Sequence, residues 1–345
     1  MSATQQMGVF QQPAKTLILS EPRTMSRTTP YALSKTLEQL LARQAGLEKE
    51  PYSNKVLAQL ARAVQKIADT YTEGKAPRAL FSNPALRTAY TGYYLPCNAI
   101  KLFPILNELF RRKALSCPDG SLRVLDLGCG PGTLLAGLLD YFLQHREHAG
   151  FTLDLTGIDR DPGNCSTAHS LIEEFTAAAP DAPTVTSTRF LQRDMHSLDR
   201  LTTASNTFDL IMAGNLINEL PPREFDDFAR RVTKLLKSTG SLIILDPGTR
   251  SSFKNLLMFR GELLAREDMH LFAPCLHPDV CPLQDCDQAW CHEKVSWTPP
   301  LHVKLIDQRT GFTKYKGVKF SYMVATRGTP PLLSPENAAP GESLW

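Results

Sequence analysis

Apolar residues recur at steps of three and four in the first third of the chain, which is the spacing of one buried face of a helix. The clearest run comprises Val56, Leu57, Leu60, Val64, Ile67 and Tyr71. Asn83 and Pro84 then form a favoured N-cap and first helical position, while Pro96 and Pro104 should break or kink the helix that follows. The pattern predicts an α-helical N-terminal region over residues 31–118.

Farther along, the pattern changes to short apolar runs that alternate with amphipathic helical stretches, which is typical of a parallel sheet covered by helices on both faces. The expected strands are residues 123–126, 152–158, 189–192, 210–213 and 241–245. Residues 302–306 and 318–324 should form a closing antiparallel pair, since the second run alternates with the two-residue period of a strand. The sequence therefore predicts an α/β fold with a seven-stranded sheet over residues 119–327.

The two ends of the chain lack this patterning. Residues 1–30 are polar and without period, and residues 328–345 are rich in proline and small side chains, so both are expected to be disordered tails. The first of them has no long apolar run and no secretory order of charged, apolar and small residues. We therefore expect a cytoplasmic protein with no membrane partner.

The net charge says little about the partners of this protein, whereas the distribution of charge along the chain says more. The net charge is +3 in 345 residues, too small by itself to indicate a nucleic-acid-binding protein. Residues 292–327, however, hold seven lysines and arginines against two acids, a local balance of +5. This segment is either a solvated basic surface or a patch that faces RNA, and no DNA partner is expected.

A glycine-rich loop follows the first expected strand. It contains Gly128, Gly130 and Gly132, with Asp126 two residues before the first glycine. Glycines permit a tight turn and close approach of the backbone to a ligand, and the following helix presents free N–H groups. The Gly-x-Gly-x-Gly spacing is not the Gly-x-Gly-x-x-Gly of dinucleotide sites. It resembles the first motif of class I S-adenosylmethionine-dependent methyltransferases, in which the loop holds an amino acid moiety and a carboxylate suits its ammonium group.

Acidic residues follow the next two expected strands. Asp159 ends the second, where a carboxylate can accept hydrogen bonds from both ribose hydroxyls of an adenosine-type ligand. After the third strand, the methyltransferase resemblance implies that Asp194 accepts the adenine amino group and that Met195 lies beside the ring. An ordinary surface acid is the alternative for Asp194.

The carboxyl end of the fourth strand carries further polar residues, in the position where ligands of doubly wound folds bind. They are Asn215, Asn218 and Glu219. After the fifth strand, residues 246–250 are either a rim of the same site or a strand-to-helix turn. No general base is obvious, but methyl transfer from a sulfonium is an in-line displacement that depends chiefly on alignment. The catalytic residues stay undefined.

Four cysteines lie within seventeen residues in an expected Cys-rich insertion at 270–298. They are Cys275, Cys281, Cys286 and Cys291. Clustered thiols in a reducing compartment favour metal binding over disulfides. Structural zinc usually uses Cys-x-x-Cys pairs, which are absent here, whereas four thiolates on an irregular loop can hold a [4Fe–4S] cluster. An iron–sulfur cluster is the interpretation we favour, with zinc and unliganded thiols as alternatives.

Several segments together resemble the methyltransferase-like proteins of the small ribosomal subunit, which occur in bacteria and as mitochondrial ribosome assembly factors. The most specific are AYTGYYLPCNA, VLDLGCGPGT, NLINEL, DPGTR, the cysteine block and FSYMVATR, between residues 90 and 327. The resemblance implies a Rossmann-like methyltransferase domain that binds S-adenosylmethionine and an iron–sulfur cluster on Cys275, Cys281 and Cys291. In mitochondrial relatives the fourth thiolate comes from farther along the chain. No cysteine follows Cys291 here, so Cys286 or another ligand would replace it.

The resemblance also implies association with small-subunit ribosomal RNA. The leading hypothesis is a protein that binds S-adenosylmethionine and either methylates this RNA or binds it during ribosome assembly. One alternative is a non-catalytic assembly factor that depends on an iron–sulfur cluster. A second alternative, a methyltransferase of small molecules, is disfavoured by the basic segment at 292–327.

Overall fold

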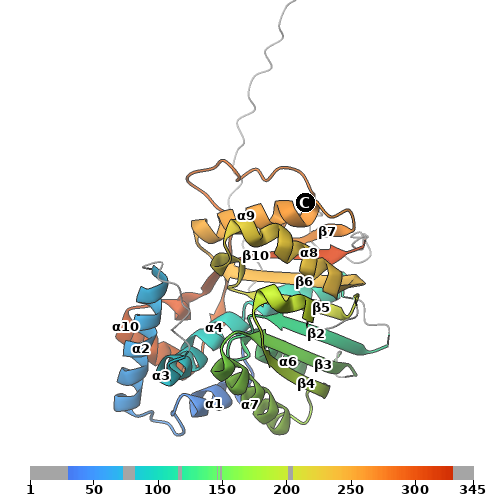
Figure 1. Ribbon diagram of the computed structural model, residues 1–345. Helices are drawn as coiled ribbons and strands as arrows, with labels where there is room; N and C mark the ends of the chain where they lie inside the picture. Colours follow the sequence, from blue (N-terminus) through green and yellow to red (C-terminus); the bar gives the residue numbers. More distant parts are fainter. Residues whose placement is uncertain are drawn as a thin grey trace, which may run out of the picture. The chain divides into compact units, whose positions relative to one another are not determined.

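The computed structural model (Figure 1) describes residues 30–72, 82–115, 119–145, 147, 150–200 and 205–328. The chain divides into two units, Met1–Pro30 and Tyr31–Trp345, and every helix and strand named below belongs to the second. The two expected tails lie outside the described residues, apart from Pro30 and Gly328 at their inner ends. Among the described helices, none is both long and apolar enough to cross a membrane.

A mixed sheet forms the centre of the second unit, with strand order β4-β3-β2-β5-β6-β10-β7. Its strands are β2 (Ser121–Leu127), β3 (Thr152–Asp159), β4 (Thr184–Gln192), β5 (Phe208–Gly214), β6 (Leu236–Pro247), β7 (Met269–Ala273) and β10 (Val318–Arg327). A short strand, β8 (Glu293–Val295), pairs with the start of β10. β2 to β6 pair in parallel, whereas β10 is antiparallel to both β6 and β7. The predicted α/β fold and its five parallel strands are confirmed.

One predicted strand is wrong. Residues 302–306 lie in helix α10 (Leu301–Thr310), whose buried side chains include Val303 and Ile306 at a helical step of three. Pro300 occupies its N-cap, since a proline before the first turn costs no helical hydrogen bond. On the side away from β6, β10 instead pairs with β7, which overlaps the segment expected as an insertion. Residues 270–298 are therefore not a separate element, because they include β7, β8 and the two-residue strand β9 (Trp297–Thr298).

The N-terminal region is helical where it is described. Its elements are α1 (Lys35–Gln44), α2 (Asn54–Thr72), α3 (Pro84–Ala89), a π-helical turn η2 (Tyr90–Tyr94), α4 (Leu95–Ala99) and α5 (Leu102–Arg111). Asn83 caps α3 as predicted, with its side chain accepting hydrogen bonds from two backbone N–H groups. The helix widens into the π turn directly before Pro96, and it is interrupted again before α5, whose first turn contains Pro104. Both prolines thus mark the predicted irregularities.

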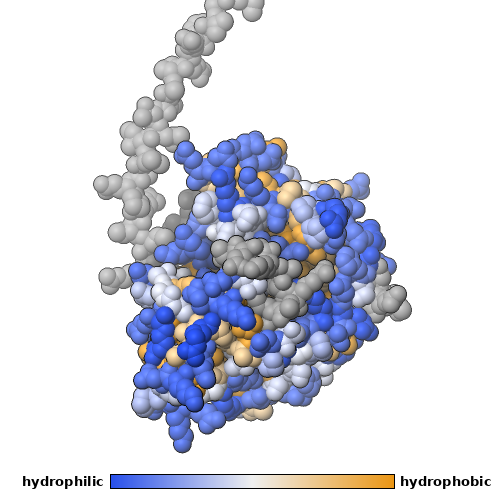
Figure 2. Space-filling view, turned by 60° about the vertical axis from the view of Figure 1, so that its left-hand side comes forward, coloured by the Kyte–Doolittle hydropathy of each residue, from blue (hydrophilic) through white to orange (hydrophobic). Residues whose placement is uncertain are grey.

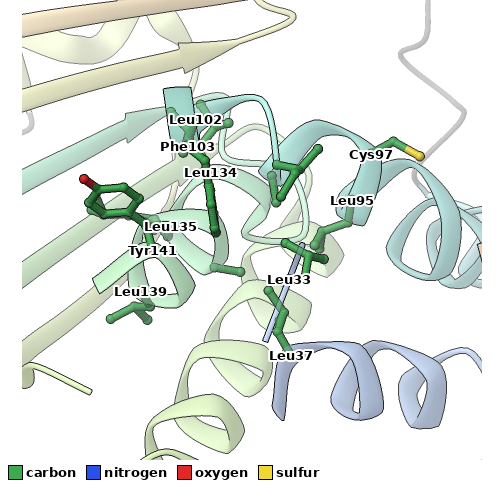
Figure 3. Packing of buried hydrophobic residues seen from close by; sticks show 14 of the residues in the cluster. Leu33, Leu37, Leu95, Cys97, Leu102, Phe103, Leu134, Leu135, Leu139 and Tyr141 are labelled. Atoms are coloured by element: carbon green, nitrogen blue, oxygen red, sulfur yellow. The ribbon is translucent and has the colours of Figure 1, made fainter. Parts of the chain in front are cut away.

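Two apolar clusters cover the two faces of the sheet, because alternate residues of each strand point to opposite sides. In β2, Val124 joins the cluster with the N-terminal helices, α6 (Thr133–Gln144) and α7 (Pro162–Ala178), while Leu125 joins the cluster with α8 (Phe225–Leu235) and α9 (Arg250–Leu264). Figure 3 shows Phe103 of α5 close to α6, and its ring meets that of Tyr141 edge to face at 5.6 Å. Hydrophilic residues predominate on the outer face seen in Figure 2.

The N-terminal helices do not stand apart from the sheet. α4 and α5 pack on α6, α1 packs on α7, and α2 packs on α10, with which it lies at the left of Figure 1. The two-residue strand β1 (Tyr31–Ala32) also pairs with β9. This packing brings the turn between α4 and α5 to the carboxyl ends of the parallel strands, where the candidate site lies.

Candidate functional site

The glycine loop joins β2 to α6, with all three glycines in the left-handed region of backbone space. Gly128 and Gly130 line the cavities described below. Gly132 lines neither of them. A Cβ atom on Gly132 would lie 3.2 Å from Ala168 of α7, so this glycine lets the loop and α7 pack closely. The sequence-predicted site residue Gly132 therefore has a packing position and not a lining one.

Asp159 fixes the loop to the end of β3. Its carboxylate accepts hydrogen bonds from Gly130 N at 2.9 Å, from Asp161 N at 2.8 Å and from Asn164 Nδ2 at 3.2 Å. Burial raises the pKa of this carboxyl group. A carboxylate has about four acceptor positions, and these three protein donors occupy three of them. About one position is left for a ligand.

A cleft of about 230 Å³ opens beside the loop, at the carboxyl ends of β2, β3 and β5. Six of the eight predicted cofactor residues line it: Gly128, Gly130, Asp159, Asp194, Met195 and Asn215. The side chain of Asp194 is 57% exposed and accepts a hydrogen bond from the backbone N–H of His196. The structure thus brings together residues from four segments that are far apart in the sequence.

Asp126 lines a smaller adjoining cavity, of about 30 Å³, together with Gly128, Gly130 and Asn215. It is 1% exposed, and neither carboxylate oxygen has a hydrogen-bond partner among the described residues. Burial, helped by the nearby charge of Asp159, raises its pKa to about 8. A buried carboxyl group without a partner is costly to ionise, so this site is suited to a cation.

The rim of the larger cleft carries an ion pair that joins β3's carboxyl end to the turn after β5. Arg160 Nη2 lies 3.4 Å from Glu219 Oε2, and burial raises the pKa of Glu219 to about 7. Asn218 turns away and accepts a hydrogen bond from Ser252 Oγ at 3.1 Å. Thr249 caps α9 by accepting from Ser252 N, so residues 246–250 are a strand-to-helix turn.

The N-terminal helices also contribute to the site, which the sequence pattern does not predict. Tyr90, Asn98 and Lys101 line the smaller cavity, and Tyr90 also lines the larger cleft. The signal for Lys101 was present, since it is the one charged residue in the apolar run NAIKLFPIL. Nothing in the spacing connects it with a glycine loop 27 residues later, which is why only the tertiary packing reveals it.

The cysteines are only partly assembled. Cys275, Cys281 and Cys291 line one cavity of about 40 Å³, whereas Cys286 is not among its lining residues. Burial raises the pKa of the Cys275 and Cys291 thiols, and the neighbouring Cys281 adds to the rise at both. All the described cysteines are free of disulfides. Within the described residues no group of three or more His, Cys, Asp and Glu side chains is arranged to hold a metal ion, so the expected four-thiolate centre is not seen.

Part of the basic segment forms a compact exposed patch. Lys294 of β8 and Lys319 of β10 are directly paired in the antiparallel register, and both are exposed. Exposed Lys316 stands before Gly317, which the Lys294 side chain approaches, and the neighbouring Tyr315 ring is 44% exposed. Arg327 is outside this patch, because it bonds Asp268 at 2.5 Å and backbone carbonyls. We call Lys294, Tyr315, Lys316 and Lys319 the basic patch.

The fold and the cleft define an α/β protein with a ligand pocket at the carboxyl ends of its parallel strands. Residues 88–336 match the family described as mitochondrial small ribosomal subunit Rsm22, and the chain belongs to this family. The predicted resemblance to methyltransferase-like proteins of the small ribosomal subunit is thereby confirmed. No curated protein is significantly similar to the chain in sequence.

Solved structures with a similar arrangement of elements include several methyltransferases. The plantazolicin methyltransferase BpumL in complex with SAH shares 13% identity over 78% of this chain and 100% of that one, with a TM-score of 0.41. The CurJ carbon methyltransferase shares 14% identity over 85% and 70% of the two chains, with a TM-score of 0.41. ChlM from Synechocystis PCC 6803, with bound SAM, shares 12% identity over 68% and 84%, with a TM-score of 0.36. Likenesses this distant say nothing of chemistry, which rests on the site itself.

Proposed function

We propose that this protein binds S-adenosylmethionine in the cleft beside the glycine loop, and that it methylates or binds small-subunit ribosomal RNA during ribosome assembly. The observation that carries the cofactor proposal is the cleft of about 230 Å³, which gathers six of the eight residues expected from the sequence. Asp126, a seventh, lines the adjoining cavity. These residues come from separate strands, so their convergence is independent evidence for one site.

Each residue then has a role that its position supports. The glycine loop and Asp126 receive the amino acid moiety, Asp159 accepts from a ribose hydroxyl, and Asp194 and Met195 meet the adenine. When bound, S-adenosylmethionine supplies a methyl group on a positively charged sulfur. Glu219, with its pKa near 7, is a cleft carboxyl group able to accept a proton from an incoming nucleophile at neutral pH.

Calorimetry of the whole protein with S-adenosylhomocysteine tests the cofactor proposal, and the absence of binding by folded protein overturns it. Glu219→Gln separates chemistry from binding. If Glu219 accepts the proton, this variant binds the cofactor normally but transfers methyl groups to RNA at least about tenfold more slowly. Retained transfer at the normal rate would exclude that role.

Two observations support ribosomal RNA as the partner. The family is one of small-ribosomal-subunit proteins. The basic patch also presents three lysines beside an exposed tyrosine ring, which is the combination that single-stranded RNA contacts through phosphates and stacked bases. Crosslinking to RNA in cells, followed by sequencing, tests both partner and location. Recovery of no small-subunit RNA would contradict the proposal.

The non-catalytic assembly factor is the competing function, and Asp159→Ala distinguishes it from the catalyst. If the fold serves only as a platform, this variant should support ribosome assembly while no longer binding S-adenosylhomocysteine. Loss of the assembly role in a folded variant would exclude the platform. A methyltransferase of small molecules would instead turn over metabolites and would not sediment with ribosomal particles.

For the cysteines we propose a metal centre on Cys275, Cys281 and Cys291, in which an iron–sulfur cluster is favoured over zinc. Their shared cavity supports the three-thiol set, and Cys286 is the candidate fourth ligand only if its loop rearranges. Anaerobic purification with elemental analysis tests this, since one zinc without iron would exclude the cluster. Cys286→Ala with unchanged iron content would show that the fourth ligand lies elsewhere.

The compartment follows from the ribosome that the protein serves. The sequence predicts a cytoplasmic setting, whereas the family description names a mitochondrial small subunit. Co-fractionation of the protein with one or other small subunit in its native cells decides between these settings.

A further inference from the structure

Lys101 is a buried amine in the turn between α4 and α5, only 8% exposed. Its Nζ donates a hydrogen bond to Asn98 Oδ1 at 2.6 Å and lies 5.9 Å from the centre of the Phe320 ring. Among the described residues it has no carboxylate at ion-pair distance, and burial lowers its pKa to about 7. A lysine is rarely buried without a partner, because removing its charge from water is costly.

The cavity that Lys101 lines also contains Asp126, whose two carboxylate oxygens have no partner among the described residues. Tyr90, Asn98 and Thr133 complete its polar surface. At about 30 Å³ the cavity exceeds the roughly 10–15 Å³ that one water molecule needs, so it has room for a small charged group.

The smaller cavity adjoins the cofactor cleft, because the two share lining residues. Tyr90, Gly128, Gly130, Gly214 and Asn215 line both. A ligand whose adenosine part occupies the larger cleft can therefore extend past the glycine loop toward Lys101 and Asp126.

Asp126 has no hydrogen-bond partner and Lys101 no ion-pair partner among the described residues. An acid and an amine placed in this way in one cavity match a ligand that carries both opposite charges. Asp126 requires a cation and Lys101 requires an anion. The α-ammonium and α-carboxylate of an amino acid supply one of each, whereas a nucleoside without that moiety supplies neither. We propose that Lys101 binds the α-carboxylate of the cofactor's amino acid moiety, oriented by Asn98, while Asp126 binds its ammonium group.

This inference rests on the proposed cofactor and extends it, because the carboxylate-binding residue comes from the N-terminal helical region and not from the sheet. The helices that pack on α6 would then complete the cofactor site. Specificity follows as well, since the site should distinguish S-adenosylmethionine from adenosine derivatives that lack the carboxylate.

Calorimetry with four ligands tests the inference on the whole protein. The ligands are S-adenosylmethionine, S-adenosylhomocysteine, decarboxylated S-adenosylmethionine and 5′-methylthioadenosine, which lacks the entire amino acid moiety. We expect Lys101→Met, an apolar replacement of similar length, to weaken S-adenosylhomocysteine binding by roughly 10- to 100-fold, the scale of a lost charged hydrogen bond. Binding of 5′-methylthioadenosine should change less than about twofold, and thermal unfolding reports whether the variant is folded.

If Lys101→Met does not fold, the affinities of the wild-type protein for two of these ligands still test the inference. The wild-type protein should bind S-adenosylmethionine at least about tenfold more tightly than the decarboxylated form, and in a folded Lys101→Met variant that preference should vanish. A wild-type preference below twofold, or a preference that survives in the variant, overturns the inference. Failure of the wild type to bind any of the ligands overturns the proposed cofactor itself, so the two failures are distinguishable.

Discussion

Asp246, the next-to-last residue of β6, has no exposed surface, and neither of its carboxylate oxygens has a hydrogen-bond partner among the described residues. Burial raises its pKa to about 8 from an ordinary 3.8, so the folded protein holds this group protonated at neutral pH. Its contribution to stability is therefore full below pH 3.8 and is lost progressively as the pH rises to about 8.

Asp246→Asn removes the free-energy cost of keeping this carboxyl group protonated at neutral pH, and it nearly keeps the shape of the side chain. At pH 7 we expect the free energy of unfolding to rise by about 2–4 kcal/mol, from about three pKa units at 1.36 kcal/mol each, taken as an upper bound. The gain should shrink as the pH falls toward 5. Urea unfolding at pH 5, 7 and 8 measures it, and a gain that does not depend on pH would contradict the assignment.

The glycine loop offers a matched pair of substitutions. Gly130 and Gly132 both have positive φ, so alanine at either position costs on the order of 1 kcal/mol of backbone strain. A Cβ on Gly130 meets nothing within 4 Å, whereas one on Gly132 lies 3.2 Å from Ala168. We expect Gly132→Ala to lose about 1–3 kcal/mol more than Gly130→Ala in urea unfolding. Equal losses in the free energy of unfolding would show that α7 can shift to make room for the added Cβ atom.

At this scale the sequence predicts a site residue well when a local motif carries it. Gly128, Gly130, Asp126 and Asp159 line the two cavities and follow directly from strand ends, since a parallel sheet brings the carboxyl ends of its strands to one edge. Lys101 and Tyr90 escape prediction because they reach the cavity only through the tertiary packing of the N-terminal helices, which for Lys101 is the packing of α4 and α5 on α6. The position of Cys286 outside the thiol cavity is likewise set by an irregular loop without periodicity.

At the scale of helices and strands, the spacing at which apolar residues recur decides which elements the sequence can predict. The strict alternation of Val318, Phe320, Tyr322 and Val324 predicts β10. The short run at 302–306 contains only one helical repeat of buried residues, which does not distinguish helix α10 from a strand. The sequence does not predict β7, because its five residues adjoin the cysteine block and pair with residues of β10 that lie 51–58 positions later.

The pairing of β8 with β10 leads to a prediction about RNA. Like charges directly opposite each other destabilise a strand pair, and the Lys294 and Lys319 pair therefore favours an anion across both. Replacing Lys294, Lys316 and Lys319 with glutamine should weaken binding to small-subunit RNA. It should also lower the slope of log affinity against log salt by about 2, since each phosphate contact contributes roughly 0.7–0.9.

The control for the basic patch removes the same charge elsewhere. Lys55, Lys66 and Lys254 are exposed on helices α2 and α9, outside the basic segment. Glutamine at these three positions should leave the salt slope unchanged within error. Filter binding at several salt concentrations measures both variants, and equal slopes for the two would remove the patch from the interface.

At the scale of the whole second unit, the N-terminal helices and the sheet share one apolar cluster. Leu102 and Leu106 of α5 belong to it together with Leu135 and Leu138 of α6, and all four have no exposed surface. The predicted boundary at residue 118 therefore marks a change in sequence pattern and not a gap in the core. The period of the apolar residues reports local structure alone. It therefore cannot reveal which helices cover which face of the sheet.

A truncated protein that begins at residue 119 should consequently not fold. Removing residues 1–118 uncovers α6, where Leu135, Leu138 and Tyr141 become exposed, and exposed apolar surface of this kind drives aggregation. It also deletes Lys101 and Tyr90 from the smaller cavity. A protein that begins at residue 31, the start of the second unit, retains all of these contacts and should stay folded. Soluble yield and circular dichroism of the two proteins provide the comparison, and a soluble, cooperatively unfolding 119–345 protein would show that the sheet forms its own domain.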